Sequence, residues 1–343
     1  MAILGFPSGG QQKTTPPITI EKIQPYLYAL DYAEITNQDY TDAAEWLRNY
    51  YAPVGGCSSA RKDNFWLRNY DWLYDNSAEF IVRIHKGGAV KYDSIGMASG
   101  YKITEEDMEN PDLSDERFRF IPFHVVDGIN ECGVIANSNV TAKGDMGKTT
   151  GTHPRGEQME MCAIALIRFI LDNYDNATDA VNYVKNHVSV YMPSKEGELD
   201  EELHLMVGDK NKTYLIEFVY NTCVVTEMTD NKIMTNFYLE DTEYNEDGEV
   251  IKSSVTDHGV GIERYNIVAR ELEAITEPTA NSMINLARHI WYTNAYGTNA
   301  GIWYSEFVGG DLTNSSPPEA FDEIRALAAQ AYATRDRNNP LTW

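Results

Sequence analysis

The sequence predicts an α+β fold in which stacked β-sheets are covered by helices. Strand-like and helix-like segments occur in separate blocks along the 343 residues, strands first, then helices, then strands and helices again. This segregation differs from the regular strand–helix alternation that produces a parallel sheet. Hydrophobic residues make up 43% of the chain and charged residues 23%, which is typical of a globular protein with a sizeable core.

The first segments of the chain contain one short helix. Residues 1–18 show no regular pattern, and the alternating stretch ITIEKIQPYLYALDY, residues 18–32, indicates a strand. Residues 40–51, YTDAAEWLRNYY, have apolar positions at helical spacing, with Thr41 as the expected N-cap. The segment APVGG then ends this helix directly before Cys57.

From Cys57 onward the pattern alternates between blocks of strands and pairs of helices. A helix at 177–188 is expected to be capped by Asn176 or Thr178. The other expected helices are 156–174, 259–275, 281–292 and a closing helix at 317–336. The expected strands lie in 64–72, 78–88, 89–97, 118–140, 203–228, 232–236 and 299–313.

The net charge of −24, from 52 acidic and 28 basic residues, argues against nucleic acid and anionic membrane surfaces as partners. Binding to either would need a basic excess to neutralise phosphates. A negatively charged small-molecule substrate would need a local arginine, because the field of the whole chain repels it. Whether the chain forms a homo-oligomer is left open at this stage.

The four cysteines, at positions 57, 132, 162 and 223, include no CxxC pair, and the HExxH motif is absent. We therefore expect neither a metal site nor any other cofactor. The N-terminus lacks a basic region followed by an apolar run of signal-peptide length, and no stretch of 18 apolar residues occurs. These features predict a soluble cytoplasmic protein with no membrane insertion.

Cys57 follows two glycines in GGCSSARKDNFWLRNYDW, residues 55–72. The glycines leave the Gly56 carbonyl open to close approach by the thiol. Attack on that carbonyl would shift the peptide to a thioester, and water would then release Cys57 as a new N-terminus. Its free α-amine, with an ordinary pKa of about 7.7–8.0, would serve as general base for the thiol of the same residue.

This junction and several later segments resemble the cysteine-type N-terminal-nucleophile (Ntn) hydrolases of the choloylglycine hydrolase, or linear amide C–N hydrolase, superfamily. That family includes bile salt hydrolases, penicillin V acylases and N-acylethanolamine acid amidases. The resemblance covers most of residues 57–310 and implies a four-layer αββα sandwich. The matching segments are RNYDW, DGINECGVIANSNV, the helices at 156–187, LHLMVGD with TYLIEF, IMTN and GIERYNIV.

The resemblance implies roles for three residues near the junction. Cys57 resembles the family nucleophile, and Arg68 resembles the arginine beside the thiol, where its charge favours the thiolate. Asp71 resembles the aspartate that holds and polarises the α-amine. The spacing from Cys57 to Arg68 is shorter than in typical bile salt hydrolases, which predicts a tighter hairpin.

Three further site residues follow from the later segments. Asn236, in IMTN, resembles the asparagine of the oxyanion hole, and Asn139, in ANSNV, fits the second oxyanion donor. Asn137 lies two positions earlier on the same strand face, so the choice between Asn137 and Asn139 stays open. Arg264, in IERY, resembles the arginine that completes the electrostatics of the site.

The position of Cys57 divides the chain into a propeptide or lead segment, residues 1–56, and a catalytic domain, residues 57–343. Many bacterial relatives carry the nucleophile directly after the initiator methionine. The 56 preceding residues therefore resemble the branches of the family that have propeptides. We expect the helix at 40–51 to cover the site until cleavage releases it.

The leading hypothesis is an amidohydrolase that cleaves a linear amide of an N-acyl compound through a Cys57 thioester. The substrate would be of the conjugated bile salt, penicillin V, or N-acyl amine or amino acid type. Acyl transfer on the same site and a non-catalytic binding protein on an Ntn scaffold are the alternatives. A papain-like protease with His204, His258 or His289 as base lacks the sequence signature of that family.

Overall fold

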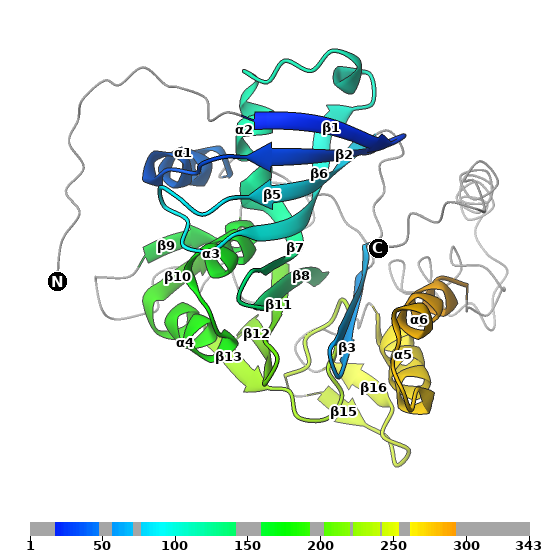
Figure 1. The fold of residues 1–343 in the computed structure, drawn as a ribbon. Helices are drawn as coiled ribbons and strands as arrows, with labels where there is room; N and C mark the ends of the chain where they lie inside the picture. The colour runs from blue at the N-terminus through cyan, green and yellow to red at the C-terminus, as the bar shows by residue number, and fades with distance from the viewer. Residues whose placement is uncertain are drawn as a thin grey trace, which may run out of the picture.

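The computed structural model describes residues 18–47, 57–70, 77–141, 159–192, 202–219, 222–240, 242–253 and 261–292. Within these ranges, nine strands form one large sheet in the order β1-β2-β5-β6-β7-β8-β11-β12-β13 (Figure 1). Neighbouring strands are antiparallel except for β2 and β5, which run parallel. The strands are β1 Ile18–Gln24, β2 Leu27–Tyr32, β5 Ser77–Ile84, β6 Ser94–Thr104, β7 Val125–Asn130, β8 Ile135–Thr141, β11 Glu202–Gly208, β12 Thr213–Val219 and β13 Thr222–Glu227.

A second, smaller sheet lies against the large one. Among the described residues it has three strands in the order β14-β3-β4, which are Ile233–Met234, Cys57–Lys62 and Phe65–Tyr70. Strand β3 contacts β8 of the large sheet. Separate two-stranded pairs are formed by β9, Met159–Cys162, with β10, Val188–Tyr191, and by β15, Thr242–Tyr244, with β16, Val250–Ser253.

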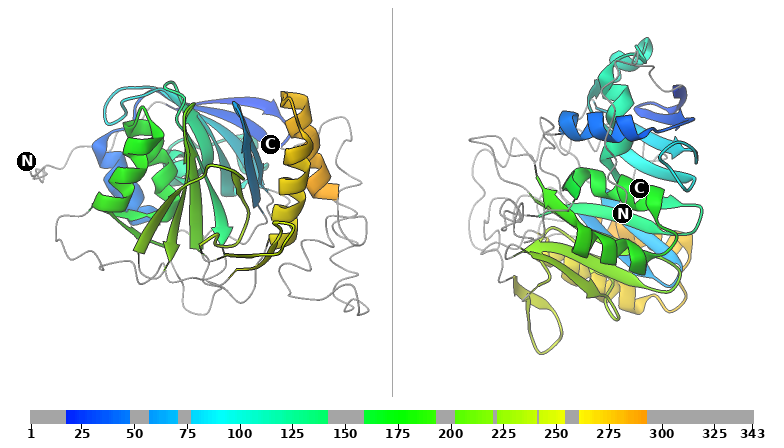
Figure 2. Two further views of the ribbon diagram at one scale, coloured as in Figure 1. Left: turned by 90° about the horizontal axis from the view of Figure 1, so that it is seen from below. Right: turned by 90° about the vertical axis from the view of Figure 1, so that its left-hand side faces the viewer.

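Helices pack on both sheets and bury the apolar faces of the strands (Figure 2). Helices α3, Leu166–Asn173, and α4, Ala177–His187, contact the large sheet, whereas α5, Ile262–Ala274, and α6, Ala280–Tyr292, contact the small one. A separate apolar cluster, which includes Met206, Leu215 and Met234, joins strands of both sheets. The fold is therefore mixed α+β with a large central sheet, as the segregated sequence blocks predict.

The sequences of β11 and β12 show little alternation between apolar and polar residues. Every residue of ELHLMVG and TYLIEFV is buried, because these strands are covered on both faces. Leu205 and Ile216 belong to the core on the helix side, while Met206 and Leu215 belong to the cluster that joins the two sheets. Polar side chains on the inter-sheet face are consequently buried as well.

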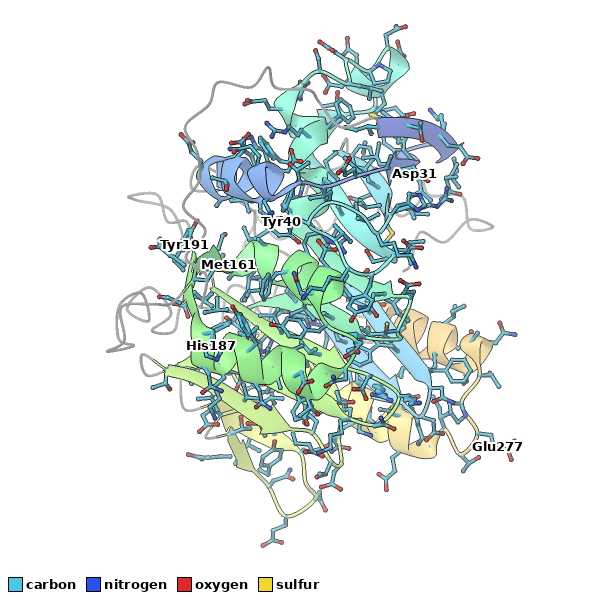
Figure 3. The ribbon with its side chains drawn as sticks, turned by 60° about the vertical axis from the view of Figure 1, so that its left-hand side comes forward. Asp31, Tyr40, Met161, His187, Tyr191 and Glu277 are labelled. Atoms are coloured by element: carbon cyan, nitrogen blue, oxygen red, sulfur yellow. The ribbon has the colours of Figure 1, made fainter. Side chains whose placement is uncertain are left out.

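The segment before Cys57 is part of this architecture. Strand β2 lies between β1 and β5 in the large sheet, and Leu30 and Tyr32 belong to its main core. Helix α1, Asn37–Leu47, contacts α2 and β9. Figure 3 shows Tyr40 of α1 on the same side as Met161 and Tyr191 of β9 and β10. Helix α1 thus packs on a different part of the molecule from β3. Contrary to the sequence expectation, the described part of this helix does not cover Cys57.

The start of helix α1 corrects the sequence expectation of a cap at Thr41. The helix begins at Asn37, four residues earlier, and the Thr41 hydroxyl donates to the Asn37 carbonyl within it. Thr36 and Asp39 form the cap instead: the Asp39 carboxylate accepts the Thr36 N–H at 2.9 Å, and Thr36 Oγ1 accepts the Asp39 N–H at 3.2 Å. This reciprocal pair is the capping-box arrangement, with Asp in place of Glu.

Two further segments differ from their sequence assignments. The expected helix at 156–174 begins with a 3-10 turn at Ala163–Ala165 and is α-helical from Leu166, because Met159–Cys162 form β9 and pair in parallel with β10. A segment of four residues is too short for its own pattern to distinguish a strand from a helix. The beginning of the expected strands at 118–140 is helical, in α2, Glu116–Phe120, and a 3-10 turn, Ile121–His124. The strand pair expected at 299–313 and the helix at 317–336 lie outside the described residues.

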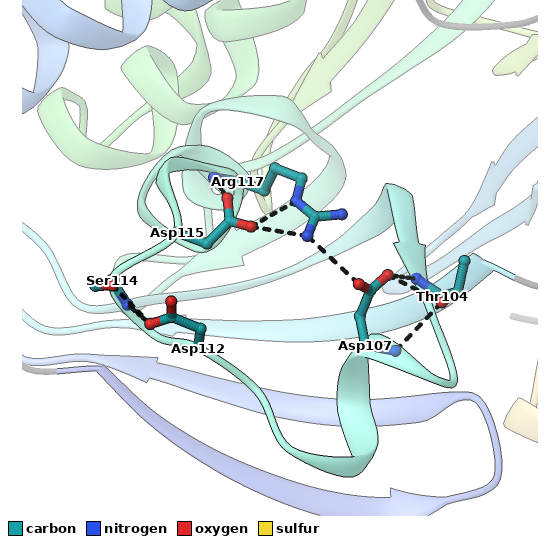
Figure 4. Close-up of polar contacts among 6 residues, drawn as sticks. All are labelled: Thr104, Asp107, Asp112, Ser114, Asp115 and Arg117. Atoms are coloured by element: carbon teal, nitrogen blue, oxygen red, sulfur yellow. Dashed lines mark hydrogen bonds and ion pairs between the residues drawn. The ribbon is translucent and has the colours of Figure 1, made fainter.

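Local polar contacts determine where α2 begins (Figure 4). The Asp115 carboxylate accepts the Arg117 N–H at 2.8 Å and also accepts the Arg117 side-chain Nε at 2.8 Å. Arg117 Nη2 donates to Asp107 Oδ1 at 3.5 Å, and the Asp107 carboxylate accepts the Thr104 N–H at 2.8 Å. These contacts fix the connection between β6 and the helical turn that precedes β7.

Candidate active site

A tight hairpin brings Cys57 and Arg68 together. Strands β3 and β4 are joined by a two-residue turn in which Asp63 has a positive φ of 52°. The register pairs Cys57 with Tyr70 and Ser59 with Arg68, so Cys57 and Arg68 are diagonal neighbours on one face. Arg68 Nη2 lies 3.7 Å from Cys57 Sγ, and both residues are buried. A guanidinium in this position favours the thiolate over the thiol.

Arg68 is held by two groups of the large sheet. Its Nη2 donates to the Ser138 carbonyl of β8 at 2.8 Å, and its Nη1 lies 3.5 Å from the Asp127 carboxylate of β7. Burial raises the pKa of Asp127 above its ordinary value, and the Arg68 charge and a hydrogen bond from the Met97 N–H oppose this rise. The sequence analysis did not identify Asp127 as a site residue, although Asp127 is the first residue of the matching segment DGINECGVIANSNV.

The backbone of Cys57 is bound to Asn236 and Arg264. The Cys57 N–H donates to Asn236 Oδ1 at 2.8 Å, and the Cys57 carbonyl accepts from Arg264 Nη1. Arg264 also donates from Nη1 to Ser58 Oγ at 2.9 Å and from Nη2 to Asn236 Oδ1 at 2.6 Å. The structure thus brings Cys57, Arg68, Asn236 and Arg264 together from β3, β4, the segment after β14 and the first turn of α5.

Asn137 and Asn139 project from β8 toward the small sheet. Asn139 Nδ2 donates to the Met234 carbonyl at 2.9 Å, and its Oδ1 accepts from Ser59 Oγ at 3.2 Å. Asn137 Nδ2 donates to the same Ser59 hydroxyl at 2.7 Å. Both asparagines therefore anchor β3 beside Cys57. Asn139 in addition holds β14, which leads to Asn236.

The remaining sequence candidates separate into two groups. Asp71 and His258 lie outside the described residues, and so does Gly56 at the expected cleavage site. The His289 side chain is also outside the described part. His204 is fully buried, with Nδ1 3.2 Å from Glu217 Oε1 and Nε2 2.8 Å from the Thr235 carbonyl. Both of its ring nitrogens are thus engaged, which argues against a papain-like base.

The described residues contain no group of three or more His, Cys, Asp or Glu side chains that could hold a metal ion. Within the same ranges, no helix is long and apolar enough to cross a bilayer.

Comparisons with known proteins find likeness at the level of structure. No family model matches the sequence, and no curated protein matches it. The structure matches a mutant of conjugated bile acid hydrolase from Clostridium perfringens at 15% sequence identity, covering 70% of this chain and 80% of that one, with a TM-score of 0.47. It also matches penicillin V acylase from Agrobacterium tumefaciens at 13% identity, covering 84% and 76%, with a TM-score of 0.33.

Proposed function

We propose that this chain is a cysteine Ntn amidohydrolase that cleaves the linear C–N amide bond of an N-acyl compound. The enzyme matures by cleavage between Gly56 and Cys57 and acts through a Cys57 thioester. In this proposal the two sheets and the helices on their outer faces form a four-layer αββα sandwich. The contacts of α3 and α4 with the large sheet, and of α5 and α6 with the small sheet, support that arrangement.

The observation that carries the proposal is that both reactive ends of Cys57 are held at once. Its nitrogen lies 2.8 Å from Asn236 Oδ1, while its sulfur lies 3.7 Å from the Arg68 guanidinium. A buried cysteine with only a packing role needs an acceptor for its backbone N–H but no guanidinium beside its sulfur. An N-terminal nucleophile needs both, because the nitrogen becomes the catalytic base when the preceding peptide bond is broken.

The proposed reaction uses the two ends of Cys57 in turn. The α-amine of Cys57 takes the thiol proton, and the thiolate attacks the carbonyl carbon of the substrate amide. The tetrahedral intermediate then collapses as the α-amine passes that proton to the substrate's leaving amine. Water then hydrolyses the thioester and regenerates the thiol. The Asn236 amide donates one hydrogen to the Val140 carbonyl at 2.5 Å, which leaves its second hydrogen for the oxyanion. Asp71 is proposed to orient the amine, and Asn139 to act as second donor.

Arg264 is proposed to belong to the catalytic site and not to bind the substrate's anionic end. Its contacts go to the Cys57 carbonyl, the Ser58 hydroxyl and the Asn236 amide oxygen. Arg264→Ala should therefore lower kcat for neutral and anionic amides alike. A rise in KM confined to anionic amides would instead identify Arg264 as a substrate clamp.

The proposal is tested by N-terminal sequencing and by assay of the processed protein. The substrates are conjugated bile salts, penicillin V, N-acyl amino acids and N-acylethanolamines. The expected result is a mature chain that begins at Cys57 and hydrolyses at least one of these amides. An active chain that still begins at Met1 would overturn the amine-as-base mechanism, and acyl transfer to an added amine in preference to water would favour the transferase.

A further inference from the structure

Two titratable residues with no role in the proposed reaction are buried between the sheets. His204 on β11 is 0% exposed and Glu217 on β12 is 2% exposed, and Nδ1 of the first lies 3.2 Å from Oε1 of the second. Burial of polar side chains carries a desolvation cost that is offset only when their polar atoms are hydrogen-bonded. The bonding partners of this pair therefore indicate what it does.

Among the described residues, the backbone partners of these two side chains belong to the short segment that carries Asn236. His204 Nε2 contacts the Thr235 carbonyl at 2.8 Å, one residue before Asn236. Glu217 accepts the Leu239 N–H at 2.7 Å and the Glu240 N–H at 2.8 Å, three and four residues after it. The pair thus holds the chain on both sides of Asn236.

The donors and acceptors at His204 are fixed by its neighbours. A backbone carbonyl only accepts, so Nε2 carries the hydrogen toward Thr235. The Glu217 oxygen that faces Nδ1 also accepts the Leu239 N–H, as a carboxylate oxygen does. Both ring nitrogens of His204 are therefore engaged, which suits a fixed link between two elements and not proton transfer.

This link reaches the candidate nucleophile through Asn236. Asn236 Oδ1 accepts from the Cys57 nitrogen and from Arg264 Nη2. The preceding residue adds a second connection, because Thr235 Oγ1 donates to the Gly261 carbonyl at the start of α5. Displacement of residues 235–240 would therefore move the Asn236 side chain relative to Cys57.

We propose that His204 and Glu217 are positioning residues that hold Asn236 in register with Cys57. This inference rests on the proposed function, since its consequence is the placement of the oxyanion donor. Losing such a donor costs about 10²–10³ in kcat, and a misplacement of about 1 Å costs about 10². A displaced but present Asn236 should accordingly lower kcat by about 10- to 100-fold, with KM changed less than about threefold.

The test compares Glu217→Gln with Asp172→Asn in the full-length chain. Arg168 and Asp172 form a buried ion pair on α3, whose partners include Tyr40 and Ser94 and, within the described ranges, none of the site residues named above. Both variants remove one buried carboxylate charge and keep the shape of the side chain. Activities are referred to the amount of Cys57 that reacts with iodoacetamide, well below the unfolding temperature of each variant.

The expected result is a 10- to 100-fold lower kcat for Glu217→Gln and an unchanged kcat for Asp172→Asn. Glu217→Asp, which restores the charge, should recover part of the loss. Equal kcat values for wild type and Glu217→Gln, or equal losses in Glu217→Gln and Asp172→Asn, would overturn the positioning role. If Glu217→Gln does not fold, His204→Gln is measured by the same criteria. A wild-type chain without processing or amide hydrolysis would refute the proposed function itself.

Discussion

Gly261 offers a direct test of how closely helix α5 fits against the segment that carries Asn236. Gly261 precedes the first turn of α5 with φ of 96°, a left-handed conformation that L residues rarely adopt. A Cβ built at this position would lie 2.7 Å from Thr235 Oγ1 and 2.9 Å from the Asn236 nitrogen. The second neighbour is backbone, so a side-chain rotation cannot relieve both contacts.

The expected cost of Gly261→Ala has two parts. The left-handed conformation costs an L residue about 1–2 kcal/mol, and overpacking of this kind costs about 1–3 kcal/mol. The free energy of unfolding should therefore fall by about 2–5 kcal/mol in total. The strain can be relieved only by moving Asn236 or the start of α5, which carries Arg264. We therefore expect kcat to fall by about tenfold or more as well.

Gly133→Ala is the matched control. Gly133 has φ of 83°, but a Cβ there would have no atom within 4 Å. In Gly133→Ala the free energy of unfolding should fall only by the conformational part, about 1–2 kcal/mol, and kcat should be unchanged. Urea unfolding monitored by tryptophan fluorescence gives both free energies. The reasoning is refuted if the two variants are destabilised equally, within about 0.5 kcal/mol, and Gly261→Ala keeps normal kcat.

Four further predictions concern maturation, the thiol and pH. Cys57→Ala should abolish processing, seen by intact mass, and hydrolysis, seen in the amide assay, and Cys57→Ser should process slowly at most. Because residues 18–47 supply β1, β2 and α1, cleavage should leave them bound; size-exclusion chromatography that separates the two chains without denaturant would disprove this. Asp127→Asn should slow iodoacetamide alkylation of Cys57 if Asp127 holds Arg68 against the sulfur, whereas faster alkylation would show that it only screens the arginine charge. Burial lowers the pKa of His124 from 6.5 to about 3, so the unfolded chain binds a proton that the folded chain does not. The contribution of His124 to the free energy of unfolding is complete above pH 6.5 and is lost at about 1.4 kcal/mol per pH unit as the pH falls toward 3. This part of the pH dependence of the free energy of unfolding should be absent in His124→Gln.

The sequence by itself determined the local parts of the candidate site. The short spacing from Cys57 to Arg68, compared with the family that the chain resembles, predicted a tight hairpin. The register of β3 and β4, which places Arg68 diagonally opposite Cys57, is a finding of the structure. The segregated blocks of strands and helices determined the α+β class. Asn236 and Arg264 came from the resemblance to a known family, and the structure places both in contact with the Cys57 backbone.

Contacts between distant segments were decided only by the tertiary structure. Asp127, His204 and Glu217 reach the site from 70 to 160 positions beyond Cys57 in the chain, through pairing of β7, β8, β11 and β12 that no local pattern specifies. The assignment of Met159–Cys162 as a strand was likewise decided by pairing with β10, since a segment of four residues is too short for its own pattern to distinguish a strand from a helix. The strands before Cys57 belong to the main sheet for the same reason: hydrogen bonding to β5, and not the segment's own pattern, makes them part of the core.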